Sequence, residues 1–97
     1  MPTYIILLRY TEQGRSHMKE SPARSDRARK AFEAAGGEMK AFYLTMGQYD
    51  AVSIIEAPSD EACVSALMSI ATEGAVQTET LRAFTEDEYQ QIVASLP

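Results

Sequence analysis

The sequence has very few of the residues that build disulfides and metal sites. It contains one cysteine, Cys63, and one histidine, His17, in 97 residues. An internal disulfide needs two cysteines, and a structural zinc site needs about four thiolate or imidazole ligands. Glycine loops that cradle phosphates and dinucleotide fingerprints are also absent. We therefore expect no disulfide, no metal and no cofactor.

Long apolar runs are missing as well. The longest is Ile5 to Leu8, whereas a membrane-spanning helix needs about 20 apolar residues. No basic segment precedes this run and no small-residue cleavage site follows it, so a secretory signal is not expected. The sequence predicts a cytoplasmic protein with no membrane partner.

Positive charge is scarce in the second half of the chain. The net charge is -5, which argues against nucleic acid as a partner. Residues 1–40 hold eight basic and five acidic side chains, and residues 41–97 hold one basic and nine acidic. The basic residues of the first half favour a solvated helix face; an anion-binding edge or a contact with the acidic half of another subunit are the alternatives.

Hydrophobic patterning predicts one α+β domain over residues 1–97. Residues 3–10 form an apolar strand covered on both faces, and Ser21-Pro22 begins a helix that ends at Gly36-Gly37. Residues 38–46 and 49–57 form an antiparallel hairpin closed by the tight turn Gly47-Gln48.

The second half of the chain predicts a second helix, an edge strand and a C-terminal helix. Ser59 caps the second helix, which ends at Gly74. Residues 75–84 alternate as a strand but are more polar, which is typical of an edge strand or a pocket wall. A capping box at 85–88 opens a last helix with the apolar residues Tyr89, Ile92, Val93 and Leu96.

The order β-α-β-β-α-β is the split βαβ, ferredoxin-like arrangement, a four-stranded antiparallel sheet with two helices on one face and the C-terminal helix added. The usual strand order 4-1-3-2 makes the two most apolar strands central. Because these strands are apolar on both faces, the face without helices needs a cover. A second copy of the chain is the simplest one, which predicts a homodimer or higher homo-oligomer of the dimeric α/β-barrel type.

The richest cluster of chemistry surrounds the hairpin turn, where Gly47 is followed by Tyr49 and Asp50. This stretch resembles the signature of the GYD domain family. The similarity extends over most of the chain, through residues 4–8, 11–14, Ser21-Pro22 and 78–85. The resemblance implies a dimeric α/β-barrel, ferredoxin-like fold, and it implies no established activity.

Eight residues are candidates for ligand binding. One interpretation is that Tyr43, Thr45 and Tyr49 line a cavity between sheet and helices or between subunits, with Asp50 as an acid, base or hydrogen-bond acceptor. The other is that Asp50 satisfies turn amides and Tyr49 only packs. If strand four faces the same cavity, it adds three polar side chains, with a further arginine on strand one. These four are Thr78, Thr80, Arg82 and Arg9.

Each arginine also has a structural interpretation. Arg82 suits a carboxylate or phosphate ligand, but it also suits an ion pair with Glu79, Glu56 or another surface acid. Arg9 can extend its charged end into solvent at the end of its strand. His17 lies in a polar segment and Cys63 on the buried stripe of a helix, so neither indicates catalysis.

Three functions are compatible with these patterns. The favoured hypothesis is a homo-oligomeric module that binds or senses a small molecule. The second is a cofactor-independent enzyme, similar to a monooxygenase or isomerase, in which Tyr49, Asp50 or His17 serves as acid and base. That hypothesis requires an Asp50 carboxylate that is free of turn amides. The third is a structural or regulatory assembly protein held together by the basic first helix and the acidic C-terminal region.

Overall fold

Four antiparallel strands form a single sheet in the order β2-β3-β1-β4. The computed structural model describes all residues, 1–97. This order is the predicted 4-1-3-2 arrangement, with β1 and β3 in the centre and β4 at an edge. The strands are β1 (Thr3–Tyr10), β2 (Glu38–Leu44), β3 (Ala51–Glu56) and β4 (Val76–Ala83).

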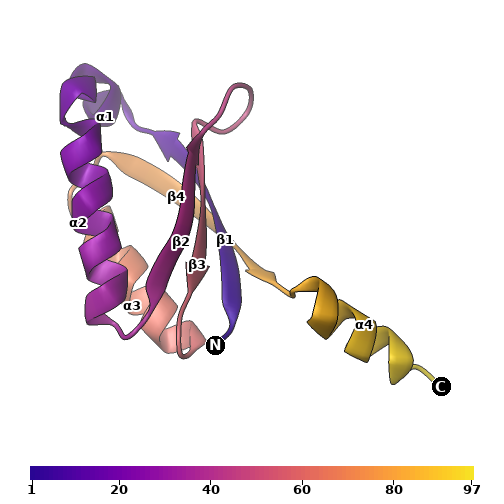
Figure 1. Ribbon diagram of the computed structural model, residues 1–97. Helices are drawn as coiled ribbons and strands as arrows, with labels where there is room; N and C mark the ends of the chain where they lie inside the picture. Colours follow the sequence, from indigo (N-terminus) through magenta and orange to yellow (C-terminus); the bar gives the residue numbers. More distant parts are fainter.

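Two long helices cover one face of this sheet and leave the other face open (Figure 1). They are α2 (Ser21–Ala34) and α3 (Asp60–Ala71). The predicted α+β, ferredoxin-like fold is therefore confirmed. The remaining helical segments are short: α1 (Glu12–Ser16), the 3-10 turn η1 (Met18–Glu20) and α4 (Glu86–Ala94).

Most of the predicted helix boundaries are confirmed by their caps. The Ser59 hydroxyl accepts the Ala62 amide, and Thr85 and Glu88 form a complete capping box. Gly36 and Gly74, at the ends of α2 and α3, have φ angles of 87° and 72°, which glycine adopts without steric cost.

The start of α2 differs from the prediction. The helix begins at Ser21 itself, after Glu20, and continues directly from the 3-10 turn η1. Ser21 therefore does not serve as the cap. Its hydroxyl lies 3.4 Å from the Tyr10 hydroxyl instead.

The predicted two-residue turn at Gly47-Gln48 is wrong, because residues 45–50 form a six-residue loop between β2 and β3. Its own hydrogen bonds hold this loop. The Thr45 amide donates to the Asp50 carbonyl at 2.9 Å, and the Thr45 hydroxyl donates to the Tyr49 carbonyl at 2.7 Å. Gly47 has the expected positive φ, 106°. The extra residues take Tyr49 out of the strand pattern.

The core lies between the sheet and α2 and α3. Tyr4 pairs with Ile55 and Ile6 pairs with Ser53 across β1 and β3, and paired residues share a face of the sheet. Ile6 and Ile55 are 2% and 0% exposed. The helices complete this core with buried Phe32, Cys63 and Ala66.

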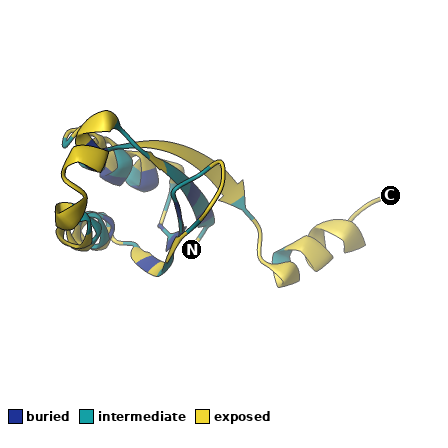
Figure 2. Cartoon of the chain, turned by 90° about the horizontal axis from the view of Figure 1, so that it is seen from above, coloured by how far each residue is buried: buried dark blue, intermediate teal, exposed yellow.

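The open face of the sheet and the whole of α4 are without cover (Figure 2). We define the open face by Ile5, Leu7, Val52 and Ile54, which pair with one another across β1 and β3. Beyond the sheet, α4 extends away from the rest of the chain, and its predicted apolar stripe is exposed (Figure 1). No helix in the structure has the length and apolar character needed to cross a bilayer.

A partly buried hydrogen bond connects the sheet to α3. The Tyr4 hydroxyl donates to the Asp60 carboxylate at 2.5 Å. Burial, followed by this hydrogen bond, raises the pKa of Tyr4 from 10.0 to about 12. The folded protein therefore holds the phenol proton more tightly than the unfolded chain does.

This difference predicts a loss of stability in alkali. Between pH 10 and 12 the unfolded chain releases the Tyr4 proton while the folded protein retains it, so stability falls as the pH rises. We expect Tyr4→Phe to have a shallower decrease in urea midpoint over this range than the wild type. Tyr89→Phe, at an exposed position, is the control. Identical slopes for wild type and Tyr4→Phe would contradict the expectation.

Candidate functional site

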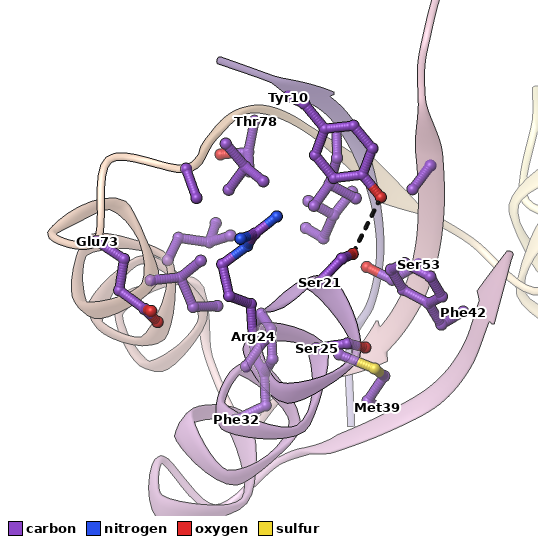
Figure 3. Close-up of a pocket in the computed structure, with 18 residues that line it drawn as sticks. Tyr10, Ser21, Arg24, Ser25, Phe32, Met39, Phe42, Ser53, Glu73 and Thr78 are labelled. Atoms are coloured by element: carbon purple, nitrogen blue, oxygen red, sulfur yellow. Dashed lines mark hydrogen bonds between the residues drawn. The ribbon is translucent and has the colours of Figure 1, made fainter. Parts of the chain in front are cut away.

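A cavity of about 60 Å³ lies between the sheet and the two covering helices (Figure 3). Apolar side chains from both layers form most of its wall, because they belong to the inward faces of β1, β2, α2 and α3. The apolar contacts come from Ile6, Leu8, Phe32, Met39, Phe42, Leu67 and Ile70.

Several polar side chains interrupt the apolar wall of this cavity. Tyr10 and Ser21 come from the end of β1 and the start of α2, and Ser25 lies one turn further along the helix (Figure 3). Thr78 on β4 adds a further hydroxyl. A mostly apolar cavity with a few polar groups is typical of small-molecule sites.

Ser53 places a hydroxyl deep in the cavity wall. The residue is 3% exposed and lies on β3 between Ala51 and Ile55, both 0% exposed. The Ser53 hydroxyl makes no hydrogen bond within the chain. Every fully buried polar side-chain atom does have a hydrogen-bond partner, so the Ser53 hydroxyl is not fully buried. The Ser53 hydroxyl must therefore be reached through the cavity, where a bound molecule can hydrogen-bond to it.

Arg24 extends from α2 among the side chains that line the cavity (Figure 3) and also lines a polar cavity that adjoins it, so it lies at the mouth between the two. Its guanidinium donates to the His17 carbonyl at 3.0 Å and to the Gly14 carbonyl at 3.3 Å. It belongs to none of the ion pairs in the chain. The half-buried cation thus has hydrogen-bond donors left for a ligand.

Glu73, also at the mouth, is occupied by a neighbouring arginine. Both of its carboxylate oxygens accept hydrogen bonds from Arg27, the shortest at 2.6 Å. This hydrogen bonding lowers the pKa of Glu73 and raises the pKa of Arg27. Glu73 is therefore ionised at neutral pH and its charge is matched by Arg27.

The predicted site residues do not form one cluster. Tyr43 pairs with Val52 and lies on the open face, whereas Thr78, Thr80 and Arg82 pair with Leu8, Ile6 and Tyr4 on the helix-covered face. Of the eight predicted residues, Thr78 alone lines the cavity. The expectation that β2 and β4 present their candidate residues to one shared cavity is therefore wrong, because Tyr43 and Arg82 lie on opposite faces of the sheet.

Arg9 and Tyr49 come together on the open face. The Arg9 guanidinium lies 4.6 Å from the centre of the Tyr49 ring and donates to the Gln48 carbonyl at 3.0 Å. The Tyr49 hydroxyl donates to Glu79 at 2.7 Å. This hydrogen bond raises the pKa of Tyr49. The loop is thereby held to both β1 and β4.

Asp50 closes the end of β1. One of its carboxylate oxygens accepts the Tyr10 amide at 2.8 Å, and its own amide donates to the Leu8 carbonyl at 2.8 Å. Thr45 is likewise occupied within the loop. The Asp50 carboxylate accepts the amide of Tyr10 in β1 and no amide of its own turn, and Asp50 does not line the cavity.

Arg82 does not form the expected ion pair with Glu79 or Glu56. Its guanidinium stacks 4.5 Å from the Phe84 ring centre and 5.7 Å from that of Tyr4. It also donates to the carbonyls of Thr3 and Ala83. These contacts hold the end of β4 against β1.

Thr78 is the one cavity-lining residue among the candidates that the sequence indicated. Two signals for other polar lining residues were present. Ser21, Arg24 and Ser25 share the helical face of Ala28, so that polar side chains continue the inward stripe of α2. Ser53 is the polar residue among the alternate positions of β3, Ala51, Ser53 and Ile55, that share one face of the sheet.

Other reactive groups lie outside the cavity. Cys63 is buried in the core, and burial raises the pKa of its thiol, so the thiol is protonated at neutral pH. Nowhere in the chain do three His, Cys, Asp or Glu side chains meet in a group that could hold a metal ion.

Comparison with known proteins places this chain in a family. The sequence model of the GYD domain matches residues 4–93. The chain belongs to the GYD domain family. A relative from Thermus thermophilus is 32% identical over 84 residues, which cover 86% of this GYD-domain chain and 88% of the relative. That protein is named glutamine synthetase and cystathionine beta-lyase binding protein.

Two solved structures share the fold of this GYD-domain protein. One is TTHA0845, also from Thermus thermophilus, with a TM-score of 0.57, 23% identity and coverage of 88% of this chain and 95% of that one. The other is a feast or famine regulatory protein from M. tuberculosis complexed with L-methionine, with a TM-score of 0.66 and 16% identity. This chain is 88% covered and spans about half, 51%, of the regulator.

Proposed function

We propose that this GYD-domain protein is a homo-oligomeric binding module that holds a small molecule in the cavity between its sheet and helices. The observation that carries the proposal is the Ser53 hydroxyl, which lies in the apolar wall and is reached through the cavity. Because this hydroxyl is accessible from the cavity and has no hydrogen-bond partner within the chain, a ligand or an ordered water in the cavity can hydrogen-bond to it.

A cavity-filling substitution tests the ligand site. Ala28 lines the cavity and Ala34 is exposed on the same helix. We expect small fragments to shift the amide NMR signals of Ser53 and Ala28 in the wild type. Ala28→Leu should weaken that binding about tenfold or more, because the added carbon atoms occupy the cavity, whereas Ala34→Leu should leave it unchanged.

Two NMR results would contradict the proposed ligand site. If no fragment perturbs the amides around the cavity, the cavity is not a ligand site. If fragments bind equally well to the wild type and to Ala28→Leu, the site lies elsewhere. A melting curve for each variant confirms that it folds before binding is compared.

The homo-oligomer rests on uncovered surface. A compact monomer of this mass exposes about 5,500 Å², whereas the chain exposes 6391 Å². The excess, about 900 Å², is close to the roughly 800 Å² that each partner buries in a standard protein interface. The radius of gyration, 14.6 Å, also exceeds the roughly 12.5 Å expected for a compact chain of this length.

A second copy of the chain can cover this excess surface, which includes the open face of the sheet and α4. The open face is a continuous apolar area, and two such faces packed against one another form a symmetric interface. Helix α4 has nine residues, fewer than the roughly 12–15 at which isolated helices are even marginally stable in water. We infer that packing against another copy stabilises α4 as well.

A protein partner is the second candidate for these surfaces. It is supported by the exposed apolar stripe of α4 and by the name of the Thermus relative, which describes binding to two enzymes. The oligomeric state decides between the two occupants. A dimer in sedimentation equilibrium supports the second copy, and a monomer favours the protein partner.

A further inference from the structure

We propose that the cavity takes small molecules with a carboxylate and a short apolar tail, with the carboxylate bound by Arg24. This inference rests on the proposed function, since it requires the cavity to be a ligand site. It adds the chemical class of the ligand and the direction in which the ligand lies. The charged end is at the mouth beside α2, and the tail points toward Phe32 and Ser53.

Arg24 has the features of an anion-binding side chain. It lines the cavity, it is half-buried and it forms no ion pair. The other two arginines along the same stretch of α2 are already neutralised, Arg27 by Glu73 and Arg29 by Asp26. A guanidinium has five donors, and the bonds to the Gly14 and His17 carbonyls use two of them. The remaining donors suit the two oxygens of a carboxylate.

The surroundings of Arg24 provide a polar approach to the cavity. A second, polar cavity of about 220 Å³ adjoins the first and shares Arg24, Glu73 and Ala75 with it. Two carboxylates lie in its wall. Glu73 is held by Arg27, and Glu20 lies on η1 away from the apolar cavity. The other residues of its wall are Gln13, His17 and Arg27.

The apolar end limits the length of the ligand. A single water requires about 10–15 Å³ of cavity measured in this way, so a cavity of about 60 Å³ accommodates about four to six non-hydrogen atoms. Its floor is apolar apart from Ser53, which suits a hydrocarbon or lightly substituted tail. The geometry therefore favours short-chain acids over long ones.

Straight-chain carboxylates are the probes that test this class. Amide NMR titrations with acetate, butyrate, hexanoate and octanoate are compared with titrations of the neutral amides butanamide and hexanamide. We expect butyrate and hexanoate to bind most tightly, and hexanoate to bind about tenfold more tightly than hexanamide, because charge-assisted hydrogen bonds are stronger than neutral ones. The shifts should include the amides of Arg24 and Ser53.

Variants of Arg24 locate the charge. Arg24→Gln removes the cation and should remove the preference for hexanoate over hexanamide, and Arg24→Lys should retain part of it. Arg29→Gln removes a cation from the exposed, ion-paired side of the same helix and serves as the matched control. Because Arg24 also holds two backbone carbonyls, the wild-type comparison of acid with amide stands as evidence even if Arg24→Gln fails to fold.

The outcomes separate this inference from the proposed function. Equal binding of hexanoate and hexanamide in the cavity overturns the carboxylate assignment and leaves the ligand site intact. Loss of preference in Arg29→Gln as well as in Arg24→Gln also overturns it, since the effect would then come from net charge alone. Binding of neither probe, nor of any other fragment, overturns both.

Discussion

Ile54→Lys is expected to abolish the proposed self-association of the protein and to leave a monomer. Ile54 lies in a row of open-face residues that crosses the sheet from Ala41 through Ile5 to Leu81. Packing two open faces together would bury this row. An unpaired ammonium placed there costs several kcal/mol, and two-fold symmetry introduces the change twice. We expect the dissociation constant to rise at least about 100-fold.

Sedimentation equilibrium measures this change directly. Ala34→Lys, which adds the same charge at an exposed position of α2, is the control and should associate like the wild type. Because Ile54 is on the face away from the cavity, Ile54→Lys should keep the folded core. A variant that remains dimeric would show that the subunits associate through another surface.

Ile55→Ala is expected to reduce the free energy of unfolding by about 3 kcal/mol. Ile55 is 0% exposed and lies between Tyr4 and Met39 on the helix-covered face. Removing most of its side chain loses burial and leaves a void that the packed core only partly closes. Since domains are stable by about 5–15 kcal/mol, this one change removes a large part of the total.

Urea unfolding at a fixed protein concentration provides the measurement, because association also contributes to the stability of an oligomer. Val64 lies on the outer side of α3 and is 51% exposed. Val64→Ala should therefore change the free energy of unfolding by less than about 0.5 kcal/mol. Equal losses for Ile55→Ala and Val64→Ala would contradict the assignment of Ile55 to the core.

Ile54 and Ile55 are neighbours in the sequence and have different expected effects. Alternation along β3 places one on each face of the sheet. The sequence alone predicts that both are apolar and that both faces need a cover. Only the tertiary structure shows which face the helices cover and which face they leave open.

The loop at residues 45–50 shows why the candidate site was harder to predict than the fold. Glycine at position 47 correctly indicated a positive φ. The loop's length, however, depends on hydrogen bonds from Thr45 and on contacts with Arg9 in another strand. Contacts between residues distant in the sequence leave no local pattern. The interpretation that Tyr49 and Asp50 serve a ligand cavity therefore fails for the cavity in this structure, because neither residue lines it.

The sequence by itself determined the features that depend on local patterns: the order of strands and helices, the helix ends at Gly36 and Gly74, the caps at Ser59 and Thr85, the central positions of β1 and β3, and the GYD family. Tertiary structure alone decided which side chains meet at the candidate site. The cavity joins residues of all four strands and of α2 and α3, and the role proposed for Arg24 depends on which carboxylates lie within reach. The physical reason is that local propensity and periodicity act within a few residues, whereas a binding site is formed by side chains that only packing brings together.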